Sequence, residues 1–196
     1  NFFVNNKKKL IILLSIIILL FLSYFAFGEI KKRSKVKLAN KYNATSINFI
    51  SGNKLNVENE MVKIIEARDK TYSPLALYFL IDNNIIVSEK KINRLFDILI
   101  NDTKVDKEIK NLIIYKKALF NSDFETENNL LKILNPVINS ESIWKSHALY
   151  LLAEYFLSKN ERHKSKEFFE KILILENSNP NIKLEAQKRI QRDFSE

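Results

Sequence analysis

The feature that most constrains this chain is an apolar run of 18 residues, Leu10 to Phe27, with no charge, proline or glycine. Its only polar members are Ser15, Ser23 and Tyr24. As a helix rising about 1.5 Å per residue, the run is roughly 27 Å long, close to the ~30 Å hydrocarbon core of a bilayer. A helix satisfies its own backbone hydrogen bonds in lipid. We therefore expect a transmembrane helix over residues 10–27, with lipid as its partner.

Two other interpretations of this run stay open. A buried core helix could be this apolar, although such helices usually keep a polar stripe. A cleaved signal peptide would place small residues at its end, as Ala26-Phe27-Gly28 does, but its apolar region usually spans only about 7–15 residues. No cysteine follows the run, which excludes a bacterial lipoprotein.

The positive charge is concentrated beside this run. Residues 1–37 carry eight Lys or Arg and the single acid Glu29, so +7 of the net charge of +9 lies there. Charge in this place meets anionic lipid headgroups. The rest of the chain lacks the basic stripe that a phosphate backbone needs, so we expect no nucleic-acid partner.

The same charges leave the membrane orientation unresolved. Three lysines precede the run, whereas five basic residues follow it at 31, 32, 33, 35 and 37. The positive-inside rule then favours a cytoplasmic C-terminal part. The chain begins with Asn rather than Met, so we expect preceding residues that could reverse this count.

The residues that carry catalysis are scarce. The absence of cysteine excludes disulfides, cysteine metal clusters and thiol catalysis. The two histidines, His147 and His163, form no metal-binding motif, and two glycines cannot supply a phosphate-binding loop. We predict a protein that is not an enzyme and has no cofactor or metal; an enzyme whose site leaves no sequence motif is the alternative.

Apolar residues three or four apart predict helices throughout the remaining chain. Their expected ranges are 29–50, 56–69, 73–84, 88–99, 106–121, 125–134, 142–159, 161–176 and 180 to the end. Asn135-Pro136 is expected to stop the sixth of these, since proline disfavours helix in the residue before it. For 29–50 the expected buried face is Val36, Ala39, Tyr42, Ala44, Ile47 and Ile50. No segment alternates with period two, so the fold class is all-α.

Short links between these helices imply antiparallel hairpins, and Phe96 and Phe169 are spaced by about two units of 34–37 residues. Residues 148–181 resemble a tetratricopeptide unit. The positions that carry this resemblance are Leu149, Leu152, Ala153 and Phe156 in the first helix, and Ser165, Phe169 and Ile172 in the second. Asn160 and Asn177 stand where the motif usually has glycine and proline.

The predicted architecture is a single N-terminal transmembrane helix followed by a tetratricopeptide-like α-solenoid of about four helix hairpins and a C-terminal capping helix. Its predicted segments are an N-terminal segment (1–9), the transmembrane helix (10–27), a basic juxtamembrane segment (28–37) and the repeat domain (38–196). In such a stack the first helix of each hairpin lines a concave face. The repeat pattern assigns to this face, as candidate partner-binding residues, Lys110, Ile113, Lys117, His147, Tyr150 and Glu154. Trp144, the only tryptophan, is either a core anchor or a partner contact.

The layout as a whole resembles the tetratricopeptide-like ancillary subunit of the Sec translocon. The resemblance rests on the N-terminal membrane helix, the short run of hairpins, a Leu-Asn-Pro-Val segment and residues 143–148 at the start of the last full unit. It implies a single-pass bacterial inner-membrane protein with a periplasmic C-terminal domain, acting as a scaffold that contacts the translocon, periplasmic chaperones or secretory polypeptides. The basic run 31–37 on that side departs from the expectation. The alternative is an envelope or division complex organiser with the same architecture.

Overall fold

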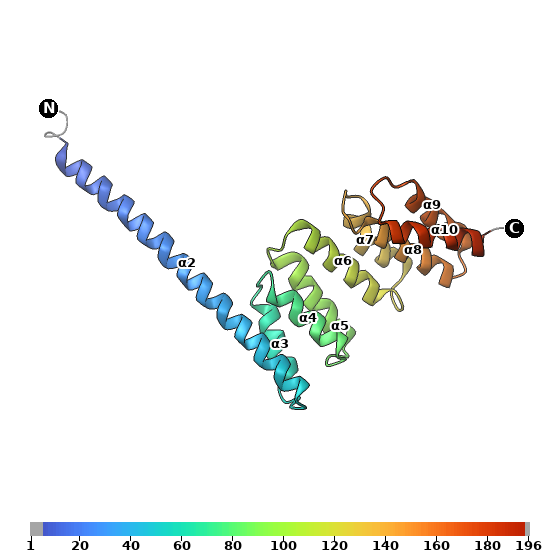
Figure 1. The fold of residues 1–196 in the computed structure, drawn as a ribbon, viewed down its shortest axis with the longest axis horizontal. Coiled ribbons are helices and arrows are strands. Elements are labelled where there is room, and N and C mark those ends of the chain that lie inside the picture. Colours follow the sequence, from blue (N-terminus) through green and yellow to red (C-terminus); the bar gives the residue numbers. More distant parts are fainter. Residues whose placement is uncertain (1–5, 195–196) are drawn as a thin grey trace. The chain divides into compact units, whose positions relative to one another are not determined.

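The computed structural model describes residues 6–194, and within them every regular element is helical (Figure 1). The elements are α2 (Lys7–Ile50), α3 (Val57–Glu66), α4 (Tyr72–Asp82), α5 (Glu89–Asp97), the π-helix η1 (Ile98–Asp102), α6 (Lys107–Asn121), α7 (Glu127–Ile138), α8 (Lys145–Ser158), α9 (Arg162–Ile174) and α10 (Pro180–Asp193). The chain divides into two compact units, one ending at Ile64 and the other starting at Ile65.

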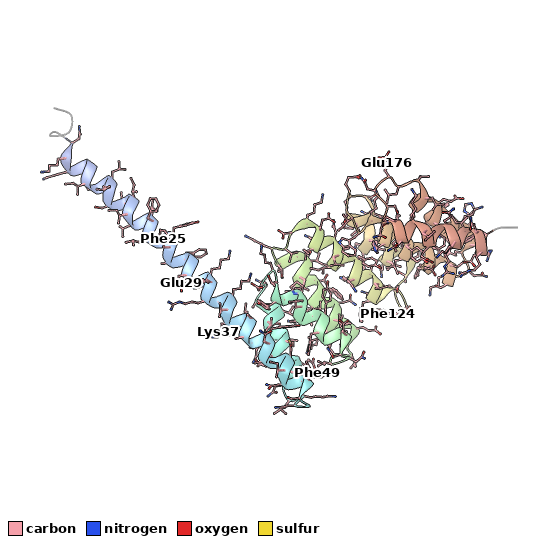
Figure 2. All side chains as sticks on the ribbon, viewed as in Figure 1. Phe25, Glu29, Lys37, Phe49, Phe124 and Glu176 are labelled. Carbon is pink, nitrogen blue, oxygen red and sulfur yellow. The ribbon has the colours of Figure 1, made fainter. Side chains whose placement is uncertain are left out.

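In the first unit, α2 is one uninterrupted helix of 44 residues that contains the apolar run and the basic segment. Figure 2 shows Phe25, Glu29, Lys37 and Phe49 at successive positions along it. By length and composition this helix can cross a membrane, and none of its most apolar stretch is buried inside the structure. A core helix would be mostly buried, whereas a signal sequence near an N-terminus would share these properties.

The last third of α2 packs through a different face from the one expected. The packed side carries Leu38, Tyr42, Thr45 and Phe49, of which Thr45 is buried and the others are half-buried. The expected residues Val36, Ala44, Ile47 and Ile50 are instead exposed. The predicted face omitted Leu38 and Thr45, both of which lie on the packed side.

An ion-pair cluster joins α2 to α3. The Lys41 ammonium lies 2.7 Å from the Glu60 carboxylate, and Lys63 lies 2.7 Å from its other oxygen. These two hydrogen-bonded ammonium groups, Lys41 first, lower the pKa of Glu60 from 4.5 to about 2. Glu60 therefore stays ionised under all ordinary conditions.

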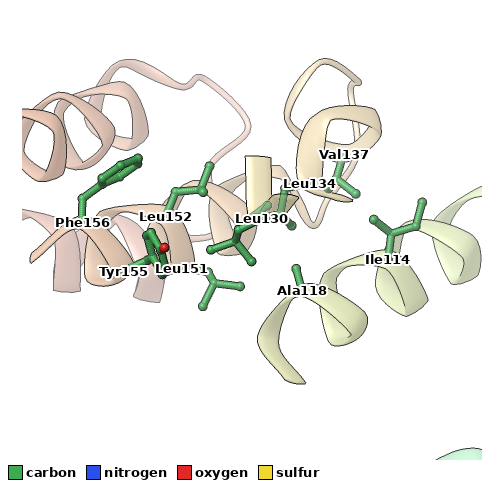
Figure 3. Close-up of a cluster of buried hydrophobic side chains, with 10 residues drawn as sticks. Ile114, Ala118, Leu130, Leu134, Val137, Leu151, Leu152, Tyr155 and Phe156 are labelled. Carbon is green, nitrogen blue, oxygen red and sulfur yellow. The ribbon is translucent and has the colours of Figure 1, made fainter. Parts of the chain in front are cut away.

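In the second unit, helices that follow one another in sequence contact one another from α4 to α10. Contacts also join α6 to α8 and α8 to α10, and in each of these pairs one helix lies between the two in sequence. An apolar cluster lies among α6, α7 and α8, where Leu130, Leu134, Leu152 and Phe156 are fully or almost fully buried (Figure 3). Short links keep successive helices adjacent, so that their apolar faces can meet.

A second apolar cluster lies among α8, α9 and α10. All seven residues assigned to the repeat core are buried. Six of them belong to one of the two apolar clusters, and Ser165 lies at the contact between α8 and α9. At this contact the Ser165 hydroxyl donates a 2.8 Å hydrogen bond to the Ala153 carbonyl, and both residues are fully buried. The two small side chains allow α8 and α9 to approach closely.

Two helix boundaries differ from the predictions. Pro136 lies inside α7, which continues to Ile138. Proline removes the hydrogen bond that its own nitrogen would donate to the preceding turn, but the helix continues after it, since the Asn139 amide donates to the Asn135 carbonyl at 3.2 Å. The helix expected from residue 73 begins at Tyr72, where the Asp69 carboxylate caps it by accepting hydrogen bonds from the Thr71 and Tyr72 amides at 2.9 and 2.8 Å.

Candidate functional site

The three candidate partner-binding residues on α6 have different environments. Lys110 is exposed, but Ile113 is fully buried, so its assignment to a binding face is wrong. Positions 110, 113 and 117 lie within about 60° of one another around α6, and this side of the helix changes from exposed at Lys110 to buried at Ile113. Lys117 is mostly buried, and its ammonium lies 2.7 Å from the Asp97 carboxylate of α5. Lys117 therefore ties two helices of the domain together.

On α8, His147 belongs to an aromatic cluster that reaches α6. The Tyr115 and Trp144 rings are stacked with centroids 6.1 Å apart, and the His147 ring lies 5.1 Å from Trp144 and 5.9 Å from Tyr115. Burial in this cluster lowers the pKa of His147 below its usual 6.5. His147 is therefore mostly neutral at pH 7, and Trp144 is a helix-start packing residue that keeps part of its surface exposed.

Tyr150 and Glu154 follow on the same side of α8, and both are engaged by the chain itself. The Tyr150 ring packs edge-on against Phe169 at 5.5 Å. The Glu154 carboxylate accepts a charge-assisted hydrogen bond from Arg189 of α10, which also pairs with Asp193 at 3.1 Å. Substituting Tyr150 or Glu154 would therefore disturb packing as well as any binding.

A hollow that the sequence did not predict lies among α4, α5 and α6. It has a volume of about 330 Å³ and is lined by Tyr78, Ile81, Asp82, Phe96, Lys116, Leu119 and Phe120. We call this feature the α4–α6 groove. Its floor is aromatic and aliphatic, because Phe96 is almost completely buried and the Phe120 ring lies 6.2 Å from it. Phe120 also packs edge-on at 5.5 Å against Phe124, which is partly exposed and is labelled in Figure 2.

Polar groups of the α4–α6 groove are not used by the protein itself. The Tyr78 hydroxyl is inaccessible to solvent and, among the described residues, has no hydrogen-bond partner. Burial, together with the nearby Asp82 charge, raises the pKa of Tyr78 to about 12, so its proton is retained. Within the described part of the chain, neither Asp82 nor Lys116 takes part in an ion pair. The groove thus offers apolar contact and a charge of each sign, and an unpaired hydroxyl is enclosed in its wall.

Sequence reasoning missed this groove although it expected a helix over residues 106–121, which include Leu119 and Phe120. The signal available was an apolar face wider than one neighbouring helix can cover, since Leu119 stays 42% exposed. How much of the apolar face of α6 stays uncovered depends on how α4 and α5 pack. That packing cannot be read from periodicity.

A second hollow of about 400 Å³ lies among α7, α8 and α9. Ile138, Leu149 and Phe168 form its apolar wall, and Lys145 and Lys171 lie at its edge. The Lys171 ammonium stands 4.6 Å from the centre of the Phe168 ring, so this cation is partly engaged by the protein. The hollow is a weaker candidate than the α4–α6 groove because none of its buried polar groups lacks a partner in the structure as described.

Over the described residues, no group of three or more His, Asp or Glu side chains is placed to hold a metal ion. Comparisons with other proteins add no assignment: no protein-family model matches the chain, and no curated protein or solved structure gives a significant match.

Proposed function

We propose that this protein is a membrane-anchored scaffold that binds polypeptides through its helical domain, with the α4–α6 groove as the binding site. The observation that carries the proposal is an apolar groove lined by Asp82 and Lys116, which form no ion pair within residues 6–194, and by Tyr78, whose hydroxyl has no hydrogen-bond partner there. A volume of about 330 Å³ is at the lower end for ligand pockets and suits one or two anchoring side chains. A bound polypeptide can place aromatic or aliphatic side chains against this apolar lining, and its backbone amides lie beside them.

The membrane anchor supports the same function. Helix α2 is long and apolar enough to cross a bilayer, and a binding domain held by one membrane helix acts on partners near that membrane. The tetratricopeptide-like resemblance of residues 148–181 also favours protein binding, since stacked hairpins offer extended contact surfaces.

The specific form that we favour is an accessory subunit of the Sec translocon in a bacterial inner membrane, with a periplasmic domain that contacts chaperones or emerging secretory polypeptides. This form rests on the overall resemblance of the chain alone. An envelope or division organiser would have the same groove and anchor but a different partner.

Site-specific photo-crosslinking tests the groove. A photoreactive phenylalanine at Leu119, in the groove, is compared with one at Leu184 on α10, which is similarly exposed at 50%. In a Gram-negative inner membrane, we expect crosslinks from position 119 to translocon subunits or secretory chains, lost when Lys116 and Asp82 are both replaced by alanine. Equal labelling from both positions would reject the groove as the site. Crosslinks only to division proteins would reject the translocon form.

Topology provides a separate test. We expect protease added to spheroplasts to remove a tag placed after Glu196. A tag that is cleaved only after lysis would place the domain in the cytoplasm and exclude the periplasmic function.

A further inference from the structure

An exposed stripe on α2 follows a heptad spacing. The stripe consists of Val36, Asn40, Asn43, Ile47 and Ile50. Its members are separated alternately by four and three residues, and all are exposed. This spacing assigns Asn40 and Ile47 to heptad positions a, and Val36, Asn43 and Ile50 to positions d. The three aliphatic side chains are 51%, 63% and 79% exposed, which is unusual for a row on one helix face.

This stripe is separate from the face that α2 uses within its own chain. At 100° per residue, the stripe centres about 150° away from the packed residues Leu38, Tyr42, Thr45 and Phe49. The Lys41–Glu60 ion pair also lies outside the stripe. The stripe is therefore free to contact another molecule while α2 and α3 stay packed.

The same register continues through the apolar part of the helix. Its positions there are Ile12, Ser15, Leu19, Leu22 and Ala26, followed by Glu29 and Arg33. Ser15 and Ala26 are small residues of the kind that let membrane helices approach closely. Glu29 and Arg33 pair with each other at 2.9 Å, so the stripe is locally neutral where the basic segment begins.

We propose that α2 forms a parallel two-stranded coiled coil with a second copy of this chain, through the stripe that runs from Val36 to Ile50. A membrane anchor holds two copies side by side and in the same direction, which is the arrangement a parallel heptad seam needs. A second copy matches the stripe at every level because Ile47 meets Ile47 and Asn40 meets Asn40. An asparagine at an a position pairs with its own counterpart and selects this register at a cost in stability.

The neighbouring charges define where the seam is closest. Lys32 and Lys37 flank it at positions g and e and repel their counterparts in a dimer, although anionic headgroups reduce this repulsion. Farther along, the flanking positions are Ala39, Ala44 and Ser46, which allow close approach. Anchoring in one bilayer also raises the effective concentration of the second copy, so a short seam is sufficient. The proposal is independent of the partner that the α4–α6 groove binds.

Disulfide crosslinking tests the seam directly because the chain contains no cysteine. Single cysteines replace Asn40, Asn43 and Asn48 in the full-length protein in lipid nanodiscs or native membranes. All three asparagines are exposed, but Asn48 lies off the stripe and is the matched control. We expect at least tenfold more disulfide-linked dimer from positions 40 and 43 than from 48, since a disulfide needs Cα atoms within about 7 Å. Equal crosslinking at all three positions would overturn the proposal.

A second variant tests the aliphatic contacts. Ile47→Lys combined with Ile50→Lys should remove the crosslink at position 43 and halve the mass of this protein per particle, measured by light scattering. Both side chains are exposed, so helicity should not change. The control is Leu55→Lys, an equally exposed residue beyond the end of α2. Two results would show that the stripe is not the interface. One is a mass of a single chain for the unmodified protein, and the other is a dimer mass for the variant that carries both lysines.

Discussion

One residue in a helix link shows how a departure from the tetratricopeptide pattern can keep the backbone conformation of a glycine. Asn160, at a position where the motif usually has glycine, has φ of 62°. Only glycine enters this left-handed region freely, and asparagine is among the residues that tolerate it best. The link between α8 and α9 therefore keeps the backbone that the glycine would supply.

The conformation of Asn160 makes a stability prediction. Asn160→Ala should lower the free energy of unfolding by about 1 kcal/mol, because alanine has no side-chain compensation for positive φ, whereas Asn160→Gly should not lower it. Thermal unfolding followed by circular dichroism measures both. Asn177→Ala is the control, since Asn177 does not have positive φ. An equal loss from that control would contradict this account.

At the scale of elements, contacts between helices depend on polar pairs that no periodicity predicts. The Asn93 and Asn121 amides exchange two hydrogen bonds of 2.8 and 2.9 Å between α5 and α6. The Glu108 carboxylate of α6 accepts hydrogen bonds from the Ser142 hydroxyl at 2.7 Å and the Ile143 amide at 3.1 Å. These bonds fix the link before α8 against α6, and so help to set how successive helices lie.

The ion pairs between α2 and α3 give a pH-dependent contribution to stability. Since the pKa of Glu60 is about 2 in the folded protein against 4.5 ordinarily, its contribution is complete above pH 4.5 and is lost as the pH falls towards 2. Replacing Glu60 by glutamine should therefore lower the melting temperature at pH 7 but not near pH 2. Thermal melts of both proteins between pH 7 and 2 measure this difference. The exposed Glu141, replaced by glutamine, is the control and should show no such convergence.

At the scale of the whole molecule, the described chain forms two units. The first contains α2 and most of α3, and the second contains the helices from α4 to α10. The last helix, α10, was predicted to be a solvent-facing cap. It does close the apolar cluster with α8 and α9 through Ala186, but it also reaches Glu154, a residue assigned to partner binding. The chain thus uses part of its predicted binding face to hold its own end.

The Glu154–Arg189 pair should matter more than other ion pairs of α10. Arg189→Met should destabilise the domain by about 1–3 kcal/mol, because it leaves a largely buried carboxylate without its partner. Adding Glu154→Gln should restore part of this loss, because the uncompensated charge disappears. Unfolding free energies of the four proteins in the cycle measure the coupling. The exposed Glu185–Lys188 pair is the control, and Lys188→Met should cost less than about 0.5 kcal/mol.

The sequence alone determined the helical class and the existence of an apolar N-terminal helix. It also placed the seven repeat-core residues inside the domain. These properties follow from local composition and from apolar residues three or four apart, which do not depend on distant parts of the chain. The same periodicity was less successful where a helix has several candidate faces, as on α2 and at Ile113 of α6.

Only the tertiary structure decided which faces meet. It placed Thr45 of α2 on the packed side and left Ile47 and Ile50 exposed. It also opened the α4–α6 groove beneath Tyr78, and it paired Glu154 with an arginine 35 residues later in the chain. These contacts depend on helix crossing and on side chains far apart in sequence, and a one-dimensional pattern contains neither.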